Sequence, residues 1–301
     1  MKKWFEKKFE RDNVHSYTLK RLNKNQNFFY KFSRMFTITN WLVLINLFVY
    51  FLLLFLIQIY GDEKILYYLA LQPSNFFAGN YWTILTSMFI HIEIWHLFAN
   101  LISLYFIGNF LERIIGRKRI FMFYILSGIF AGLFYSFFSY YFGNTVLGAR
   151  IFGDPKIYAV GASGAIFSLL GVLSVLTPYT NVYLIAGPII AIILQVIIEK
   201  IFISQIYSII GMIIYFYILL SILSIFSYGP LFKISLPIKV PFYALPIIAI
   251  LPLVIISFFV QLPIGNSAHI GGLFAGLIYA YYLKIRYKKK TELIKRYFSR
   301  F

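Results

Sequence analysis

Residues 268–276 read Ala-His-Ile-Gly-Gly-Leu-Phe-Ala-Gly, and they open an apolar stretch that continues to residue 283. Gly272 and Gly276 are four residues apart, so in a helix they share one face and allow a second helix to approach closely. His269 precedes Gly272 by three residues and lies on roughly the same face. An ionisable side chain within an apolar span is costly and marks a functional candidate. The stretch therefore predicts a closely packed membrane helix that carries a functional histidine.

The composition of the whole chain excludes an ordinary soluble domain. Of the 301 residues, 60% are hydrophobic and only 13% are charged, against roughly 45–50% and about 25% in soluble proteins. A 21% aromatic content excludes collagen-like and disordered chains. The absence of cysteine excludes disulfides, thiolate metal sites and a cysteine nucleophile. We therefore expect a polytopic membrane protein.

Eight apolar segments read as membrane-spanning helices, and they give an all-α fold. A span needs about 20 mostly apolar residues, so the chain has room for roughly six to nine. The segments lie near residues 40–60, 94–114, 120–142, 160–178, 182–198, 206–225, 242–259 and 268–283. With a cytoplasmic N-terminus, the fourth span ends inside and the last begins outside, so an odd number must intervene. The three segments between them satisfy this condition.

The distribution of basic residues predicts the orientation in the membrane. Under the eight-span topology only four of the 28 Lys and Arg side chains lie outside, namely Lys64, Arg150, Lys156 and Lys200. This bias is typical of cytoplasmic loops and places both termini in the cytoplasm. The net charge of +18 is therefore a topology signal rather than a sign of nucleic-acid binding. We divide the chain into a basic cytoplasmic segment 1–36, a transmembrane domain 37–285 and a basic cytoplasmic tail 286–301. The first segment is either a helix on the inner leaflet or a disordered stretch.

The scarce histidines mark a second candidate site. The chain has four, and His91 and His96 lie at the outer start of the span near residues 94–114. Asn100 follows His96 by four residues, so these two share a helix face, whereas His91 is rotated from His96 by about 140°. The cluster is compatible with a metal or proton-relay site, although its only neighbouring carboxylate is Glu93.

Residues 161–165, Gly-Ala-Ser-Gly-Ala, form the third candidate site at the start of another span. The amides of a first helical turn lack intrahelical partners and can stabilise a developing oxyanion. This span and the last one both run from outside to inside, so Ser163 and His269 lie at a similar depth. A nucleophile and its base need proximity in space and not in sequence. GxSG alone is more often a packing patch, but together with His269 it predicts a Ser–His pair.

Together these motifs resemble those of the rhomboid family of intramembrane serine proteases, over about residues 37–283. Each motif is complete in this chain. The matching residues are His91, His96 and Asn100 for HxxxxHxxxN, Gly108 and Glu112 for GxxxE, Gly161, Ser163 and Gly164 for GxSG, and Ala268, His269, Gly272 and Gly276 for AHxxGxxxG.

The resemblance implies a six-helix core, here with two additional spans within residues 180–260, and a role for each matched residue. Ser163 would be the nucleophile and His269 the general base, without a third, orienting carboxylate. His96, Asn100 and the backbone amide of Ser163 would form the oxyanion hole, and His91 would hold the outer loop. Phe167 occupies the place of an aromatic ring against the catalytic imidazole. The supporting positions are Trp82, Glu112, Gly161, Gly164, Phe167, Asn266, Gly272 and Gly276.

Two departures from the family pattern bear on these expectations. Trp82-Thr83 stands where the family has Trp-Arg, so an arginine that anchors the outer loop is missing. This puts the stability of the loop in doubt more than the chemistry. The stretch between Ser163 and His269 is also long for a six-span core. Which of the three middle segments corresponds to the family's gating helix is left open.

The resemblance implies a serine endopeptidase that cleaves transmembrane-helix substrates near the outer membrane face, with no metal or other cofactor. The expected partners are single-span membrane proteins and the lipid bilayer, not nucleic acid, and the expected location is a prokaryotic plasma membrane. One alternative is a catalytically inactive rhomboid-like protein that binds clients, which the presence of both Ser163 and His269 disfavours. The other is a transporter with a histidine relay, which the scarcity of ionisable residues in the middle spans disfavours.

Overall fold

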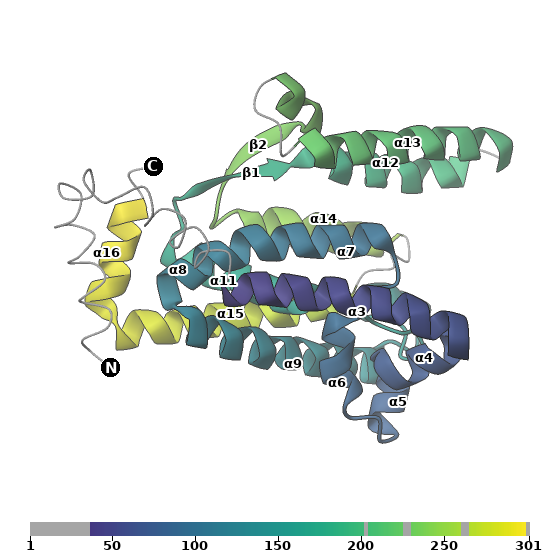
Figure 1. Cartoon of the computed structure of the whole chain (residues 1–301), viewed down its shortest axis with the longest axis horizontal. Coiled ribbons are helices and arrows are strands. Elements are labelled where there is room, and N and C mark those ends of the chain that lie inside the picture. The colour runs from purple at the N-terminus through teal and green to yellow at the C-terminus, as the bar shows by residue number, and fades with distance from the viewer. Residues whose placement is uncertain (1–36, 202–203, 225–229, 260–264, 299–301) are drawn as a thin grey trace, which may run out of the picture.

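The computed structural model describes residues 37–201, 204–224, 230–259 and 265–298, which form a bundle of helices (Figure 1). The expectations for segment 1–36 lie outside the described residues. In chain order the elements are α3 (Ile38–Tyr60), α4 (Asp62–Leu69), α5 (Pro73–Phe77), α6 (Thr83–Thr86), η2 (Ser87–Phe89), α7 (Ile94–Ser103), the π turn η3 (Leu104–Gly108), α8 (Asn109–Ile115), α9 (Arg117–Phe142), α10 (Val146–Phe152), α11 (Ser163–Leu176), β1 (Asn181–Ile185), α12 (Ala186–Ile201), α13 (Ser204–Ser224), η4 (Pro230–Ser235), β2 (Pro237–Pro241), α14 (Leu245–Ser257), α15 (Asn266–Arg286) and α16 (Lys288–Phe298).

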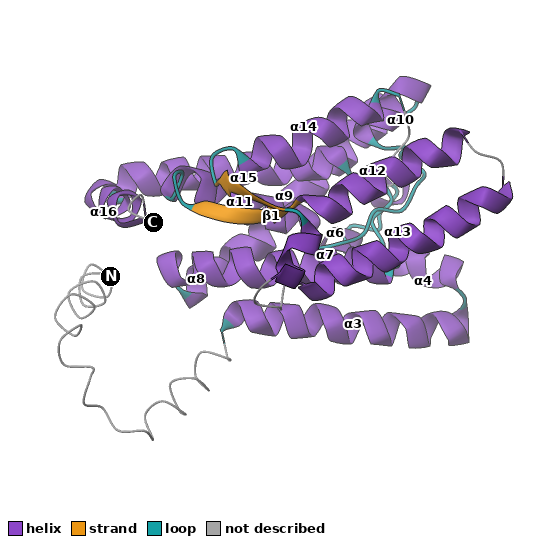
Figure 2. Ribbon diagram, turned by 90° about the horizontal axis from the view of Figure 1, so that it is seen from above, coloured by secondary structure: helices purple, strands orange, loops and turns teal. Residues whose placement is uncertain are grey.

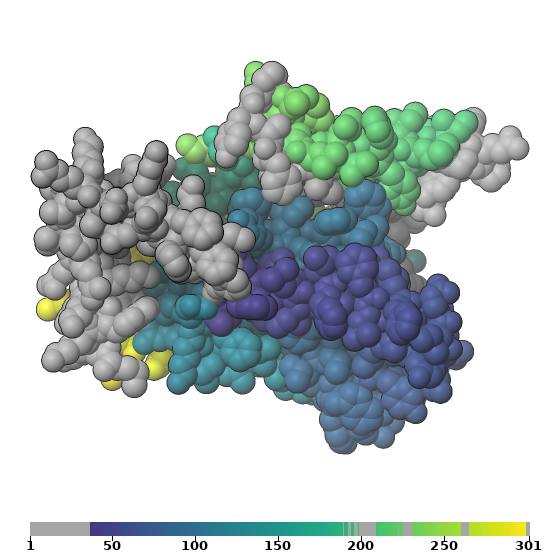
Figure 3. All heavy atoms as spheres, in the orientation of Figure 1, coloured from purple at the N-terminus to yellow at the C-terminus, as the bar shows by residue number. Residues whose placement is uncertain are grey.

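Three helices of the described chain are long and apolar enough to cross a membrane: α3, the continuous α7–η3–α8 helix, and α9. Only 22% of the most apolar 18-residue stretch of α3 is buried. Phe48, Phe51 and Phe55 on this helix are each more than half exposed, and the space-filling view shows α3 along one face of the molecule (Figure 3). So large an apolar surface is typical of contact with lipid and not with water.

Each of the eight predicted apolar segments forms a helix over most of its length. Shorter apolar helices within Ser163–Leu176, Ile209–Ser221 and Leu245–Ser257 accompany the three long ones. Successive long helices run in opposite directions along the bundle (Figure 1). The helical architecture follows the prediction, while the number of helices that cross the membrane stays a prediction.

Helix α11 lies at the centre of the core, where it packs most extensively against α15 and α9. Ten of its 14 residues are buried. A helix that is apolar on every face is stable only where other elements surround it. The remaining helices are therefore arranged around α11.

The glycines of α11 and α15 allow the backbones of the two helices to meet. A Cβ atom on Gly272 would lie 2.0 Å from the carbonyl oxygen of Gly164, and one on Gly276 would lie 2.2 Å from the carbonyl oxygen of Ser168. No side chain fits at either position without a shift of backbone. Small residues at helix interfaces permit this approach in membranes, where packing and not the hydrophobic effect drives association.

Glu112 fixes the start of α3 against α8. The side chain is 5% exposed. Its carboxylate accepts hydrogen bonds from the amides of Ile38 (3.1 Å) and Thr39 (2.8 Å) and from Thr39 Oγ1 (2.8 Å). Amides of a first turn have no intrahelical acceptor, and a negative charge there also complements the helix dipole. Glu112 thus supplies from another helix the partners that the start of α3 lacks.

A two-stranded ribbon departs from the all-α prediction. Strands β1 and β2 pair antiparallel, with Asn181 opposite Pro241 and Ile185 opposite Pro237. The segment expected to be helical from residue 182 therefore begins as a strand, and its helix starts at Ala186. Alternating β-branched, aromatic and aliphatic residues favour this pairing. Helices α12 and α13 pack mainly on each other and on η4, and they lie over α7 and α14 in both views (Figures 1 and 2).

We predict that Glu112→Ala lowers the thermal stability of the protein in detergent micelles. The substitution leaves the half-buried amide of Ile38 and the buried amide and hydroxyl of Thr39 without their acceptor. Hydrogen bonds to charged groups are each worth about 1.5–3 kcal/mol. Glu63→Gln on the exposed surface of α4 is the matched control and should leave the melting temperature unchanged. Equal melting temperatures for Glu112→Ala and the unmodified protein would contradict the anchoring role.

Candidate active site

Ser163 and His269 form a hydrogen-bonded pair. The Oγ atom of Ser163 lies 2.8 Å from Nε2 of His269. Ser163 is the first residue of α11, and His269 lies in the first turn of α15. Because the glycine contact fixes these two helices against each other, the pair is held by two rigid elements. The structure thus brings together the two residues that the sequence predicts at equal depth.

Phe167 stacks on the imidazole of His269. The ring centroids are 4.4 Å apart and the planes differ by 22°. Phe167 follows Ser163 by one helical turn, so α11 presents both side chains to the same histidine. His269 is 8% exposed, and its Nδ1 has no hydrogen-bond partner among the described residues. Stacking therefore orients the ring from one side while Nε2 points at the serine.

Gly161 brings the chain before Ser163 against His96. It has a φ of +115°, which L side chains rarely adopt, and a Cβ atom there would lie 2.7 Å from Cε1 of His96. Asn100 is buried on the same helix, and its Nδ2 donates to the carbonyl oxygen of His96 at 2.9 Å. An amide nitrogen carries two hydrogens, so this bond leaves Asn100 one donor for another acceptor. His96 and Asn100 therefore lie beside the turn that leads into Ser163.

His91 lies in the loop before α7 and is fully buried. Its ring packs edge to face on His96, with centroids 5.1 Å apart. Burial, together with the smaller effect of the neighbouring His96, lowers the pKa of His91 from 6.5 to about 3. His91 is therefore uncharged at neutral pH. Across the described parts of the chain, no three His, Cys, Asp or Glu side chains gather as metal ligands.

Asn266 lies one turn before His269 and is 3% exposed. Neither its Oδ1 nor its Nδ2 has a hydrogen-bond partner within the described chain. The sequence expects Asn266 only as a position that matches the family pattern, and its role stays a prediction. Its side chain does not bond directly to His269 in this structure.

The loop between α3 and α7, residues 61–93, is held without the arginine that the family pattern has. Trp82 Nε1 donates to the carbonyl oxygen of Tyr68 at 2.8 Å. Thr83 is 1% exposed, and its Oγ1 donates to the carbonyl oxygen of Asn80 at 2.6 Å. Thr86 Oγ1 donates to the carbonyl oxygen of Leu69, the last residue of α4, at 2.7 Å. The bonds of Trp82 and Thr86 to backbone carbonyls of α4 thus tie α4 to α6.

Backbone contacts that the sequence does not reveal connect this loop to the site. Leu71 and Ala159 exchange two amide–carbonyl hydrogen bonds, of 3.0 and 2.7 Å, four residues before Ser163. The amide of Gly161 donates to the carbonyl oxygen of Ser87 at 2.9 Å. Backbone pairing of this kind leaves no residue-type signal in the sequence. These backbone hydrogen bonds link the loop directly to the segment that leads into α11.

Comparison with known proteins gives a family match and several relatives. Residues 78–227 match the family model described as the Rhomboid domain. The matched region contains Ser163, His91, His96 and Asn100 and ends before His269.

The relatives include proteases and an inactive protein. The Rhomboid protease AarA of Providencia stuartii is 33% identical over 136 residues, which are 42% of this chain and 46% of the relative. RHOMBOID-like protein 12, mitochondrial, of Arabidopsis thaliana is 27% identical over 42% of this chain and 39% of its own. Inactive RHOMBOID-like protein 8 of the same plant is 38% identical over 34% of this chain and 25% of its own. The chain thus spans less than half the length of each.

We predict that Gly272→Ala separates α11 from α15. A methyl group there meets the carbonyl oxygen of Gly164, which belongs to the backbone and cannot rotate away. The expected result is a lower melting temperature in micelles. Gly211→Ala in α13 is the matched control, because its Cβ would meet nothing within 4 Å. A Gly272→Ala variant as stable as the control would show that the two helices are not held by this contact.

We predict that acidification destabilises the protein in part through His91. The pKa of His91 is about 3 in the folded chain and 6.5 in the unfolded chain. Between pH 3 and pH 6.5 the unfolded chain therefore binds a proton at His91 that the folded chain does not bind. The free energy of unfolding therefore falls as the pH drops below the upper value. Melting temperatures between about pH 7 and pH 5 should fall less steeply in His91→Gln than in the unmodified protein. Parallel pH profiles would exclude His91 as the titrating group.

Proposed function

The chain belongs to the rhomboid family, and from the geometry of the site we propose that it is an intramembrane serine endopeptidase. The observation that carries the proposal is the 2.8 Å contact between Ser163 Oγ and His269 Nε2. A serine hydroxyl is a weak nucleophile until a base at this distance accepts its proton. The apolar helices around the pair make the chain an integral membrane protein.

In the proposed reaction, Ser163 Oγ attacks the carbonyl carbon of a peptide bond while His269 Nε2 takes the hydroxyl proton. The tetrahedral intermediate then collapses, and His269 gives this proton to the nitrogen of the leaving amine. Water hydrolyses the resulting ester of Ser163, with the same histidine as base. The stacked ring of Phe167 keeps the imidazole in place through both proton transfers.

The oxyanion of the intermediate requires donors beside Ser163. We assign this role to His96, Asn100 and the backbone amide of Ser163, which stands at the start of α11 where helix amides lack intrahelical acceptors. The contact of His96 with Gly161 supports the assignment, because it places the imidazole at the turn before the nucleophile. One donor of an oxyanion hole contributes about 10²–10³-fold to the rate.

The proposed substrates are transmembrane helices of single-span proteins, cut near the outer membrane face. A helix hides its carbonyl groups in hydrogen bonds, so small or helix-breaking residues near the cleavage point would ease unwinding. The basic bias of the loops supports the proposal that both termini are cytoplasmic. The location that we propose is a prokaryotic plasma membrane. One relative is named as mitochondrial, so the family is found in more than one membrane.

Helix α14 is our assignment for the gating helix among the three middle segments. It packs against both α11 and α15, whereas α12 and α13 pack mainly on each other. Arg150 of α10 donates to the carbonyl oxygen of Phe258, just beyond the end of α14, at 3.3 Å. Helix α14 therefore borders the site, and the α12–α13 hairpin is the addition to the six-helix core.

A catalytically inactive, client-binding role is the second candidate. The similarity to a protein named as an inactive rhomboid-like protein favours it. The intact Ser163–His269 contact favours the protease, because client binding alone makes no use of a hydrogen-bonded nucleophile and base.

We predict that purified protein in lipid cleaves a fluorogenic single-span substrate and that Ser163→Ala and His269→Ala each abolish cleavage. Loss of the nucleophile or its base removes most of the roughly 10⁶-fold acceleration that such residues give as a unit. Ser174→Ala is the matched control, since this serine lies on the same helix as Ser163 and its Oγ donates to the carbonyl oxygen of Gly171.

Circular dichroism and gel filtration should show all variants folded. Cleavage that survives Ser163→Ala would overturn the assigned nucleophile. An unmodified protein that leaves several substrates intact, yet retains them on a column, would favour the client-binding role.

A further inference from the structure

Helix α16 lies across one end of the bundle instead of continuing the direction of α15 (Figure 1). Thr291 and Ile294 on one face are buried. Phe298 at its end packs edge to face on Phe110 of α8, with centroids 5.1 Å apart. Thr180 Oγ1 donates to the carbonyl oxygen of Phe298 at 3.5 Å. The tail predicted only as a basic segment is therefore a docked helix with one buried and one exposed face.

The exposed face of α16 joins a cluster of cations. Lys288, Lys289, Lys295 and Arg296 are exposed on α16. The junction of α8 and α9 lies at the same end of the bundle (Figure 1) and adds further basic side chains. These are Arg113, Arg117, Lys118 and Arg119. Of the two acidic residues in these segments, Glu112 is buried, bonds the start of α3 and also pairs with Arg117 at 3.8 Å, and Glu292 is the exposed carboxylate. The balance of charge at this end is strongly positive.

Two of the cations border a shallow hollow between the helices. Arg119 donates to the hydroxyl of Tyr287 at 3.3 Å, and its guanidinium lies 5.2 Å from the centroid of the same ring. Lys290 also lines this hollow. The floor is apolar and well filled, and it consists of Ile114, Ile115, Leu176, Leu283 and Ile294. A ligand would therefore lie across the cationic rim and not inside the hollow.

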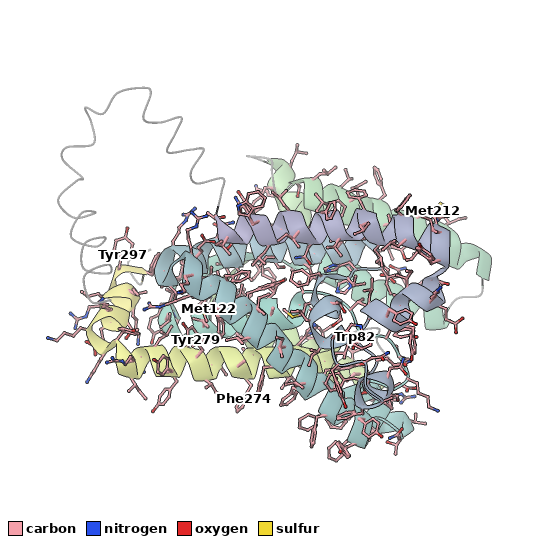
Figure 4. All side chains as sticks on the ribbon, turned by 60° about the horizontal axis from the view of Figure 1, so that its bottom comes forward. Trp82, Met122, Met212, Phe274, Tyr279 and Tyr297 are labelled. Carbon is pink, nitrogen blue, oxygen red and sulfur yellow. The ribbon has the colours of Figure 1, made fainter. Side chains whose placement is uncertain are left out.

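Exposed tyrosines place this end of the bundle at the surface of the membrane. Tyr179, Tyr243 and Tyr297 are each more than half exposed, and Lys295 Nζ lies 5.3 Å from the ring centroid of Tyr179. Figure 4 shows Tyr297 on α16, well separated along the bundle from Trp82 of the outer loop. Tyrosine favours the level of the lipid headgroups, because there its ring contacts apolar acyl chains while its hydroxyl contacts water. The cations of α16 thus lie at the depth of lipid phosphates.

We propose that this surface, formed by α16 and the α8–α9 junction, binds the headgroups of anionic phospholipids. Leu293 is exposed beside the lysines of α16, which suits the boundary between headgroups and acyl chains better than a soluble anion. Each Lys or Arg near an anionic leaflet gains about fivefold in affinity, and the gain falls with salt. The proposal concerns the membrane environment of the protein and does not depend on the protease activity.

The test is native mass spectrometry of the full chain in detergent micelles, titrated with dioleoylphosphatidylglycerol or dioleoylphosphatidylcholine. The anionic lipid should bind about tenfold more tightly than the zwitterionic one. The combined variant Lys118→Gln, Lys288→Gln, Lys289→Gln should lose this preference and bind the two lipids about equally. All three side chains are exposed, so the variant is expected to fold.

Two control variants separate the surface from general charge effects. Lys64→Gln with Lys156→Gln removes exposed cations from the loops near the opposite end and should leave binding unchanged. The variant Lys118→Arg, Lys288→Arg, Lys289→Arg keeps the three charges and should keep the preference for the anionic lipid. Equal binding of both lipids, or full binding by the Gln variant, would overturn the proposal. Displacement of the lipid by millimolar inorganic phosphate would assign the cations to a free anion and would overturn it as well.

Discussion

The contact between the backbones of α11 and α15 is the constraint on which the rest of the structure depends. A Cβ atom on Gly272 would lie 2.0 Å from the carbonyl oxygen of Gly164, and one turn further along a Cβ atom on Gly276 would lie 2.2 Å from the carbonyl oxygen of Ser168. Two helices that meet at this distance leave little freedom of rotation or sliding. Ser163 and His269, at the N-terminal ends of these helices, therefore have a defined separation. The site is carried by helices rather than by loops, which favours the precise geometry that proton transfer needs.

Several of the buried polar groups in this apolar bundle lie near its two ends. Glu112 collects the amides at the start of α3, and the outer loop is tied down by hydroxyls bonded to backbone carbonyls. His91, His96 and His269 lie close together near the start of α11. An uncharged His91 packed on His96 costs far less in a buried position than an imidazolium would. The polar residues thus support either the fold at one end or the candidate site at the other.

The sequence predicts the helices and the paired residues because their signals are local or periodic. Apolar length gives the segments, and the four-residue spacing of Gly272 and Gly276 gives the face that meets α11. The β1–β2 ribbon is missed because residues 182–185 are as apolar as the helix that follows them. The loop contacts of Leu71 with Ala159 are missed because backbone pairing has no residue signature. Helix α16 is missed because eight Lys and Arg after residue 283 read as a solvated tail, although Thr291 and Ile294 on one face are buried.

The measurement that tests the central claim most directly is covalent labelling of the protein in lipid with a fluorophosphonate, followed by peptide mapping. The hydroxyl of an activated serine displaces fluoride from phosphorus and gives its proton to the paired histidine. If α11 and α15 hold Ser163 against His269 as described, the label is found on Ser163 alone and is lost in a His269→Gln variant that remains folded. Labelling of other serines to the same extent, or labelling that does not depend on His269, would contradict the account.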